Sequence, residues 1–484
     1  MNAYDVAVLG GGIAGFSAAL RLQRQGLRTL VLEAHGQLGG CAGFFRRRGF
    51  SFDVGATTLV DFELGGVGGR FLAEVGLPLP PGEYLDYQAW LPDRQLTLYR
   101  DPEKWRAERL AKLGATASHQ AFWQLLDTVT EVFWAASRDG IKLPLQSLGD
   151  ATRALRLLGW RHLPLARYLP RTCQQVLVQF GLAHDQPLRG LLSMLVEDTV
   201  HSTLSEAPFI NAALGCTIRG AGLLQPTGGM QQFWQQLAAQ YLHLGGTLKK
   251  GHRVLAFGKE GTAWRVATSK GAYRAAKLIS ALPLDVTNAL VPAAVQARLA
   301  PHWVRNESLR GGAVVVFLGV PEVNLAGQAL THHQLLQDYG QSLSNGNNMF
   351  ISASAAGDTL SAPPGYRAVM VSTHCELADW ANLTPAAYKT QKQAIGGHLA
   401  ALAKRVYPDL DREAVVYEVA TPLTYQKFTG RPGGAVGGFR QTLRNANLRA
   451  VPQDIGLPDF WLAGDNTWPG LGTVAGLISG RIAA

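Results

Sequence analysis

Cysteine is scarce in this sequence, and long apolar runs are missing. The four cysteines are widely spaced, and none belongs to a Cys-x-x-Cys pair or another metal-ligand spacing: Cys41, Cys173, Cys216 and Cys375. This pattern predicts reduced thiols, a cytoplasmic setting and no metal site. No run approaches the ~20 apolar residues that a membrane-spanning helix needs, and the first apolar stretch lacks the basic residues of a signal peptide. We therefore expect a protein that is soluble or peripherally attached to a membrane.

Acidic residues are absent between Asp150 and Asp185, in a chain whose overall net charge is +10. Arginines interleaved with apolar and aromatic side chains suit an element lying in an anionic bilayer surface, although an ordinary solvated helix face is the alternative. Pro164 and Pro170 should break the stretch into short helices. We expect a cytoplasmic protein attached peripherally to the cytoplasmic membrane, and no nucleic-acid partner, because no recognition motif is present. The basic residues of this stretch are Arg153, Arg156, Arg161, Arg167 and Arg171.

Residues 5–33 carry the most informative motif. An apolar run ends at Leu9, and glycines follow in the order Gly10-x-Gly12-x-x-Gly15 before a helix with an apolar face. Gly10 permits a tight turn, Gly12 lets the backbone approach a pyrophosphate, and Gly15 lets helix and strand pack closely. The helix N-terminus offers free N–H groups to phosphates, and Glu33 stands where an acid can bond ribose hydroxyls. A dinucleotide site is predicted, and its contacts extend to Ile13, Ala14 and Ala34.

A second glycine pair and a Gly-Ala turn extend this motif. Gly39-Gly40-Cys41 is followed by the segment 46–56, which ends in Asp53-Val54-Gly55-Ala56. An NAD enzyme has no need of this extension. It resembles the extended FAD fingerprint shared by flavin amine oxidases, escort proteins of the GDI type, and carotenoid desaturases and isomerases. The resemblance implies FAD as the cofactor, with the glycine pair along its ribityl-pyrophosphate and the Gly-Ala turn near its isoalloxazine. The residues implied are Gly39, Gly40, Cys41, Gly55, Ala56 and Thr57.

The end of the chain resembles the C-terminal flavin motif of the carotenoid branch. A short apolar run precedes Gly464-Asp465, and a glycine-rich segment then opens a helix near Gly472. The resemblance implies that Asp465 bonds ribityl or phosphate oxygens. It also implies that the helix aims backbone N–H groups at the flavin N1–C2=O edge. In the middle of the chain, a strand would cradle the adenine. The further residues implied are Thr473, Val474 and Val254.

Length and motif placement together predict two domains. A chain of 484 residues is too long for one core, and the FAD motifs lie at its start, middle and end. We expect an α/β fold with a discontinuous Rossmann-type FAD-binding domain of the amine oxidase and phytoene desaturase type (residues 1–70, 220–290 and 410–484). The remaining segments (71–219 and 291–409) should form an α+β domain that binds substrate and faces the membrane.

The resemblance is closest to the carotenoid desaturase and isomerase branch, and it covers most of the chain. It is best over residues 5–69, 222–257 and 417–480, and residues 52–69 resemble bacterial enzymes that desaturate the ends of acyclic carotenoids. It implies an FAD-dependent carotenoid desaturase with a polyene substrate. A cis–trans isomerase or saturase of the same fold stays open. A flavin amine oxidase does too, although Cys41 stands where those enzymes usually carry arginine. A GDI-type escort protein is disfavoured, because the FAD motifs are complete.

Polyene oxidation needs few acid–base groups. Hydride loss from an allylic C–H leaves a cation that the polyene delocalises, and loss of a neighbouring proton then gives the new double bond. The catalytic residues stay unassigned. Asp61, Glu63 and His201 are candidate bases, each with a structural role as the alternative. No second GxGxxG for NADPH occurs, which favours a quinone or oxygen as electron acceptor. A carotenoid tunnel should open near residues 151–184, with these candidate lining residues: Trp123, Phe133, Trp134, Phe209 and Ile210.

Overall fold

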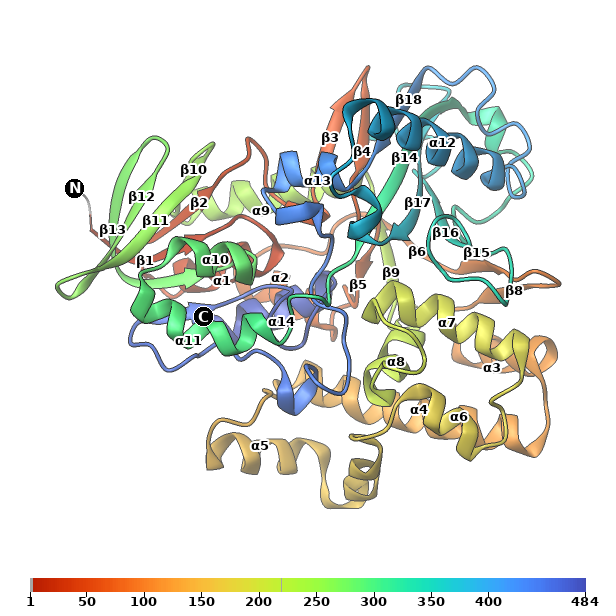
Figure 1. Cartoon of the computed structure of the whole chain (residues 1–484), viewed down its shortest axis with the longest axis horizontal. Coiled ribbons are helices and arrows are strands. Elements are labelled where there is room, and N and C mark those ends of the chain that lie inside the picture. Colours follow the sequence, from red (N-terminus) through yellow and green to blue (C-terminus); the bar gives the residue numbers. More distant parts are fainter. Residues whose placement is uncertain (1–2, 219) are drawn as a thin grey trace.

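The computed structural model describes residues 3–218 and 220–484, and it contains two large sheets with a helical layer beneath them (Figure 1). The first sheet has the order β10-β2-β1-β13-β12-β11, with β19 paired to β13. Its parallel strands come from the start, middle and end of the chain: β1 (Ala3–Leu9), β2 (Thr29–Glu33), β10 (Thr247–Lys250), β13 (Gly271–Ser280) and β19 (Phe460–Leu462). A hairpin of β11 (Val254–Glu260) and β12 (Ala263–Thr268) completes it.

Helices cover both faces of this sheet, and the side chains of β1 alternate between the two cores that result. Val6 and Val8 belong to the core shared with α1, whereas Ala7 and Leu9 belong to the core that contains Leu284 of α10. One group of helices comprises α1 (Ile13–Arg24), α2 (Val67–Val75), α9 (Gly229–His243) and α14 (Thr473–Ala483). The other comprises α10 (Leu284–Leu290) and α11 (Ala293–Val304). The expected Rossmann-type α/β architecture is thereby confirmed.

The second sheet is mainly antiparallel and has the order β18-β14-β17-β16-β15-β7-β8. Its strands are β7 (Tyr87–Trp90), β8 (Gln95–Leu98), β14 (Gly312–Pro321), β15 (His332–Leu336), β16 (Asn348–Ala353), β17 (Tyr366–Cys375) and β18 (Val416–Ala420). Helix α12 (Pro385–Ala403) packs on one face, where Val314, Val371 and Leu399 share a core. The strand β18 pairs with β14, so part of segment 410–484 joins this sheet and not the first one.

A helical layer lies below the two sheets in Figure 1. It contains α3 (Pro102–Leu113), α4 (Ala117–Arg138), α5 (Leu148–Leu158), the 3-10 segment η2 (Trp160–Tyr168), α6 (Cys173–Gln179), α7 (Gln186–Val200) and α8 (Phe209–Cys216). The basic stretch is broken as its prolines predicted: Pro164 lies inside η2, and Pro170 precedes α6. No helix in the described part of the chain is long and apolar enough to cross a membrane.

Short strands connect the layers. Strands β3 (Phe44–Arg47) and β4 (Phe50–Asp53) form a hairpin, and β9 (Leu223–Pro226) lies between β5 (Leu59–Val60) and β6 (Gly82–Leu85). Phe50 and Phe52 of β4 pack with Phe317 of β14, which joins the hairpin to the second sheet. The short elements η1 (Gly40–Ala42) and α13 (Pro422–Thr429) contact each other, and α13 also contacts β14 and β18 of the second sheet.

Candidate functional site

The turn between β1 and α1 has the geometry that its glycines predicted. Gly10 has a φ of +101°, and its N–H donates to Leu32 O at 2.8 Å. Gly12 is the N-cap of α1, and a Cβ there would meet open space. A Cβ on Gly15 would lie 2.4 Å from Gly10 O and 2.7 Å from the Ala281 side chain. Gly15 therefore permits close helix–strand packing, and Gly12 leaves the backbone open to a ligand.

Glu33 ends β2 and is bonded to the glycine turn. Its carboxylate accepts the Gly11 N–H and the His35 N–H, both at 2.7 Å. Burial raises the pKa of Glu33, while these two N–H bonds act in the opposite direction. Ala34 follows directly. Val254 begins β11 near this end of the sheet, because the His252 N–H donates to Glu33 O at 2.8 Å. The predicted ribose and adenine residues are thus neighbours.

The second glycine pair lies against the first turn. Gly39 forms a parallel bridge with Gly12, and its φ of +119° lies in the left-handed region. A Cβ on Gly40 would lie 3.8 Å from Gly12 Cα. Cys41 follows in η1 and is partly exposed, and a Cβ on Gly55 would lie 2.4 Å from Cys41 O. Three segments of the predicted cofactor site therefore meet here, through close backbone contacts.

The C-terminal motif lies beside the β1–α1 turn. Gly472 is the N-cap of α14, with Thr473 and Val474 in its buried first turn. The two helices α1 and α14 run side by side: a Cβ on Gly476 would lie 2.4 Å from Ile13, and one on Gly480 would lie 2.3 Å from Ala14 O. The first turns of both helices therefore lie on the same side of the sheet.

These features fit FAD. Neither α1 nor α14 has a side-chain cap or an acidic residue in its first turn, so both N-termini offer unpaired N–H groups. A Cβ on Gly12 or Gly472 would meet open space, so a ligand can approach both turns. When bound, FAD supplies a hydride acceptor to the site. The residue-by-residue contacts with it stay predictions.

Asp465 has a partner that the sequence did not reveal. Its Oδ2 lies 2.6 Å from Nη2 of Arg431, and the two side chains are only 20% and 16% exposed. Arg431 also donates to Gly437 O at 2.7 Å. Burial alone would lower the pKa of Arg431, but Asp465, Cys41 and Asp285 together outweigh burial and raise it. Arg431 therefore stays charged and fixes Asp465 beside Gly464, whose φ is +120°.

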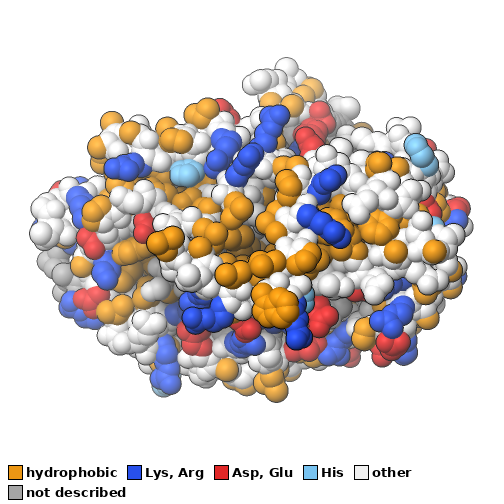
Figure 2. Space-filling model, turned by 90° about the horizontal axis from the view of Figure 1, so that it is seen from below, with side chains coloured by type: hydrophobic (Ala, Val, Ile, Leu, Met, Phe, Trp, Pro, Cys, Tyr) orange, Lys and Arg blue, Asp and Glu red, His pale blue; other side chains and the backbone are white. Residues whose placement is uncertain are grey.

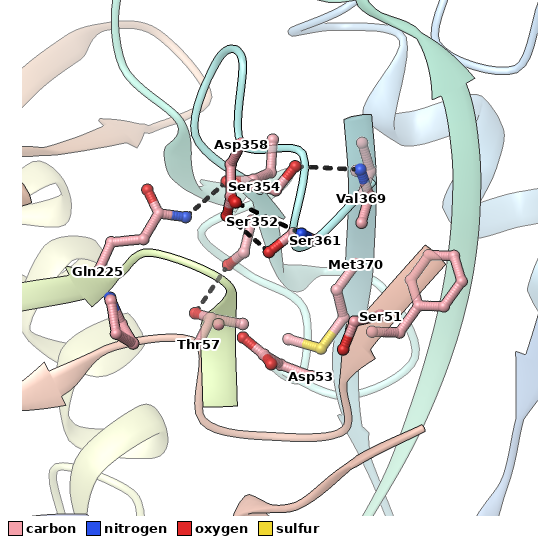
Figure 3. A pocket seen from close by; sticks show the side chains of 15 residues that line it. Ser51, Asp53, Thr57, Gln225, Ser352, Ser354, Asp358, Ser361, Val369 and Met370 are labelled. Atoms are coloured by element: carbon pink, nitrogen blue, oxygen red, sulfur yellow. Dashed lines mark hydrogen bonds between the residues drawn. The ribbon is translucent and has the colours of Figure 1, made fainter. Parts of the chain in front are cut away.

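The Gly55-Ala56-Thr57 turn faces the second sheet. Thr57 Oγ1 lies 3.0 Å from His332 Nε2 of β15 and 3.3 Å from Ser352 Oγ of β16. Next to it is a small polar cavity that Asp53, Asp358 and several serines line (Figure 3). The Met230 N–H donates to Asp53 at 2.9 Å, whereas burial raises the pKa of Asp53 to about 7. Asp53 thus holds the N-terminus of α9 beside this turn.

The three candidate bases have different environments. Asp61 is 1% exposed in its side chain, pairs with Arg138 at 2.6 Å and accepts the Val67 N–H at 2.7 Å. Glu63 pairs with Arg100 at 2.6 Å, and both of these side chains are more than 40% exposed. Both carboxylates already have cationic partners, so their roles are structural. His201 differs, because it ends α7 inside the protein with a φ of +52°.

His201 is part of a cluster that the sequence did not indicate. Its ring centroid lies 4.8 Å from that of His374 on β17. Nδ1 of His374 lies 3.6 Å from Oε2 of Glu197, which also accepts an N–H from the Asn348 amide at 2.6 Å. A Cβ on Gly437 would lie 2.5 Å from the His201 ring. Glu197 and His201 are only four residues apart, but His374, Asn348 and Gly437 lie far from them in sequence, so no local motif joins the cluster.

The proposed tunnel residues are placed mainly in the core. Trp123, Trp134, Phe209 and Ile210 are buried in the largest hydrophobic cluster, and Phe133 is partly buried against it. Their helical spacing therefore reflects packing between α4 and α8. Among residues 3–218 and 220–484, no group of three or more His, Cys, Asp or Glu side chains could hold a metal ion.

Known proteins with similar sequences include carotenoid enzymes. Prolycopene isomerase 1 of Oncidium hybrid cultivar is 25% identical over 501 residues, which cover 99% of this chain and 83% of that protein. The lycopene-forming phytoene desaturase of Pantoea ananas is 23% identical over 497 residues, which cover 96% and 95%. The structure of cyclohexylamine oxidase from Brevibacterium oxydans IH-35A matches with a TM-score of 0.63 at 17% identity, over 100% of this chain and 98% of that one; it shows the fold alone.

A family model decides the classification. The model described as flavin containing amine oxidoreductase matches residues 13–484. This match confirms the flavin cofactor, FAD, that the glycine motifs and two helix N-termini predicted. The resemblance to carotenoid desaturases and isomerases is confirmed as well. The chain belongs to the flavin containing amine oxidoreductase family.

Proposed function

We propose that this protein is an FAD-dependent enzyme that acts on a long apolar polyene, and that it desaturates a carotenoid. A hydride leaves an allylic carbon for the flavin, a neighbouring carbon loses a proton, and a new C=C bond forms. The observation that carries the proposal is the similarity along nearly the whole chain to a phytoene desaturase and a prolycopene isomerase. Both of those proteins are named for polyene substrates.

The chemistry of the site supports this proposal. The carboxylates of Asp61 and Glu63 have arginine partners, and Asp465 is held by Arg431. A polyene stabilises its own charge, so alignment beside the flavin is the main requirement. Two helix N-termini that converge on the cofactor site favour negative charge on the reduced flavin.

The surface of α5 and η2 supports delivery from a membrane. Leu148, Leu155, Trp160 and Leu163 are 86%, 51%, 74% and 49% exposed, and Arg161 lies over the Trp160 ring at 5.4 Å. Hydrophobic side chains gather across the middle of the face seen from below, with both basic and acidic side chains around them (Figure 2). Apolar anchors combined with arginines suit an anionic bilayer surface. We propose peripheral attachment to the cytoplasmic membrane by this surface.

Isomerisation of a carotenoid is the second candidate, because the prolycopene isomerase match covers 99% of this chain. The two reactions differ in mass balance. Desaturation removes two hydrogens and leaves the flavin reduced until an acceptor, which we propose to be a quinone or oxygen, reoxidises it. Isomerisation leaves the mass unchanged and needs reduced flavin without consuming it.

The deciding experiment is anaerobic incubation of the FAD-loaded protein with an acyclic carotenoid in liposomes. Chromatography with absorption and mass detection should show the loss of two hydrogens, a red-shifted product and bleached flavin. A changed retention time at constant mass, seen only after the flavin is reduced, would instead establish the isomerase. If neither carotenoid nor flavin changes, the polyene assignment fails, and amines become the next substrates to test.

Vesicle flotation tests the membrane surface separately. Trp160→Glu and Leu148→Glu should each weaken binding to vesicles containing phosphatidylglycerol, because each moves a carboxylate into an anionic surface. Leu242→Glu is the matched control, since Leu242 is 54% exposed on α9, in another part of the molecule. Equal flotation of all three variants would contradict the proposed surface.

A further inference from the structure

A pair of imidazoles lies where the end of α7 packs against the second sheet. His201 comes from the end of α7 and His374 from β17, which is third of seven strands in its sheet. A side chain at such a central position is normally covered. His374 nevertheless keeps 21% of its side chain accessible, and Glu197 beside it keeps 15%. The cluster is therefore not fully covered by protein, and a small part of it stays accessible.

This cluster is also connected to the predicted flavin motif. Gly437 packs on the His201 ring, and a Cβ on the next residue, Gly438, would lie 1.9 Å from Asp465 O. Gln441 N donates to Val200 O at 3.1 Å, and the Gln441 side chain donates to Pro469 O at 2.9 Å. One loop thus packs against the end of α7 on one side and segment 465–470 on the other. Of the three candidate bases, His201 is the one held in such a position.

We propose that His201 accepts the proton that the polyene loses during desaturation, and that His374 and Glu197 are positioning residues for it. This inference rests on the proposed desaturase function. The balance is complete: the allylic C–H bond breaks and its hydrogen leaves with two electrons for FAD. The neighbouring C–H bond then breaks, its electron pair forms the new C=C bond, and its proton passes to an imidazole nitrogen of His201. The imidazolium later releases this proton to solvent.

The charges around the pair support this division of roles. Burial, His374 and Arg440 all lower the pKa of His201, so it is neutral and able to accept a proton. Burial also acts against charge on His374, but Glu197 and Asp198 of α7 outweigh it and raise the pKa of His374. Arg440 itself is paired with Glu376. The amide of Asn348, on β16, completes the surroundings of Glu197.

The test measures kcat against pH for the FAD-loaded protein with the carotenoid that it converts. Wild-type activity should rise with pH through a value below 6.5, the ordinary pKa of a histidine. His201→Gln should lower kcat by roughly 100-fold or more and abolish this rise, with FAD content and the flavin spectrum unchanged. His374→Gln should move the rise to higher pH, because the cation facing His201 is lost. His243→Gln is the control, since His243 is exposed on α9.

A readout that does not depend on turnover comes from NMR of the wild-type protein with ¹³C-labelled histidine, with signals assigned through the two Gln variants. At pH 6.5, the ordinary pKa of a histidine, His374 should be mostly imidazolium and His201 mostly neutral, and the opposite assignment would overturn the inference. So would a His201→Gln variant with the wild-type rate and pH profile. If His201→Gln does not fold, the pH at which the activity of His374→Gln rises decides, and an unshifted rise would overturn the inference. A wild-type protein that converts no polyene at all removes the proposed function and this inference together.

Discussion

Removing Arg431 should strongly destabilise the cofactor site. Its guanidinium is 16% exposed, lies 2.6 Å from Asp465 and also donates to Gly437 O. Arg431→Met keeps most of the side-chain volume but leaves the Asp465 carboxylate without its counter-charge. Breaking a buried ion pair from one side costs about 3–5 kcal/mol, because the remaining charge is uncompensated. If the folded apoprotein tolerates the change, this cost becomes a loss of FAD affinity of roughly two to four orders of magnitude.

Two assays divide this cost between folding and cofactor binding. Urea unfolding of the FAD-free protein gives the stability change, and quenching of flavin fluorescence gives the dissociation constant. Arg431→Met should lose about 3–5 kcal/mol in total. The double variant Arg431→Met with Asp465→Asn should lose less than the sum of the two single changes, because no unpaired carboxylate remains.

Arg274→Met is the matched control for this experiment. Arg274 and Glu260 lie 2.5 Å apart, but their side chains are 46% and 45% exposed. An exposed pair of this kind contributes about 1 kcal/mol or less. The reasoning is refuted if Arg431→Met and Arg274→Met have equal effects, or if the two changes at Arg431 and Asp465 are additive.

Three further variants test other parts of the structure. Gly480→Ala should lower stability by about 1–3 kcal/mol and weaken FAD retention, because its Cβ lies within 2.3 Å of a backbone oxygen of α1. Thermal melts should show no such loss for Gly397→Ala, whose Cβ meets open space in α12. The pKa of Asp53 is raised to about 7 by burial, so the folded state favours its protonated form and loses stability as pH rises from about 4 towards 7. Asp53→Asn should therefore stabilise the protein more at pH 8 than at pH 5, by on the order of 2 kcal/mol in urea unfolding, and a gain independent of pH would count against a buried carboxyl. Phe209→Ala should lower stability by about 3–5 kcal/mol if Phe209 is part of the core. An unchanged thermal melt with altered carotenoid products would instead indicate that Phe209 lines a substrate tunnel.

The glycine motifs predicted the parts of the site that depend on local backbone geometry. Gly10, Gly12 and Gly15 set the β1–α1 turn, and Gly472 caps α14, as the spacing indicated. Gly10, Gly15 and Gly472 are recognisable because their backbone conformation or packing disfavours other residues, whereas Gly12 leaves open space for a ligand. The same reasoning predicted the Rossmann-type sheet from segments far apart in the chain.

The partners of polar side chains were not predictable in this way. Arg431 and Asp465 are separated by 34 residues, and Glu197 and His374 by 177. The first pair depends on how the loop after α13 packs beside the turn after β19, and the second on how α7 packs against the second sheet. No local spacing records either contact. The same limit explains β18, which lies in the segment expected to join the FAD-binding domain (410–484) but pairs with β14 of the second sheet. Aromatic residues could not be assigned for a related reason, since helical spacing is the same for core and tunnel residues.

The imidazole pair also separates the two polyene reactions. Both proposed reactions would use a flavin at the same two predicted helix N-termini, so residues beside the cofactor would not distinguish them. Desaturation requires a group that removes a proton from the substrate without returning it, whereas isomerisation under reduced flavin leaves the hydrogens of the substrate intact. His201→Gln should therefore abolish the loss of hydrogen from a carotenoid while leaving isomerisation by the reduced enzyme close to the wild-type rate. Mass detection on one set of reactions, with oxidised and with reduced flavin, would show both effects. Equal loss of the two activities would mean that His201 acts on the shape of the site and not on the proton.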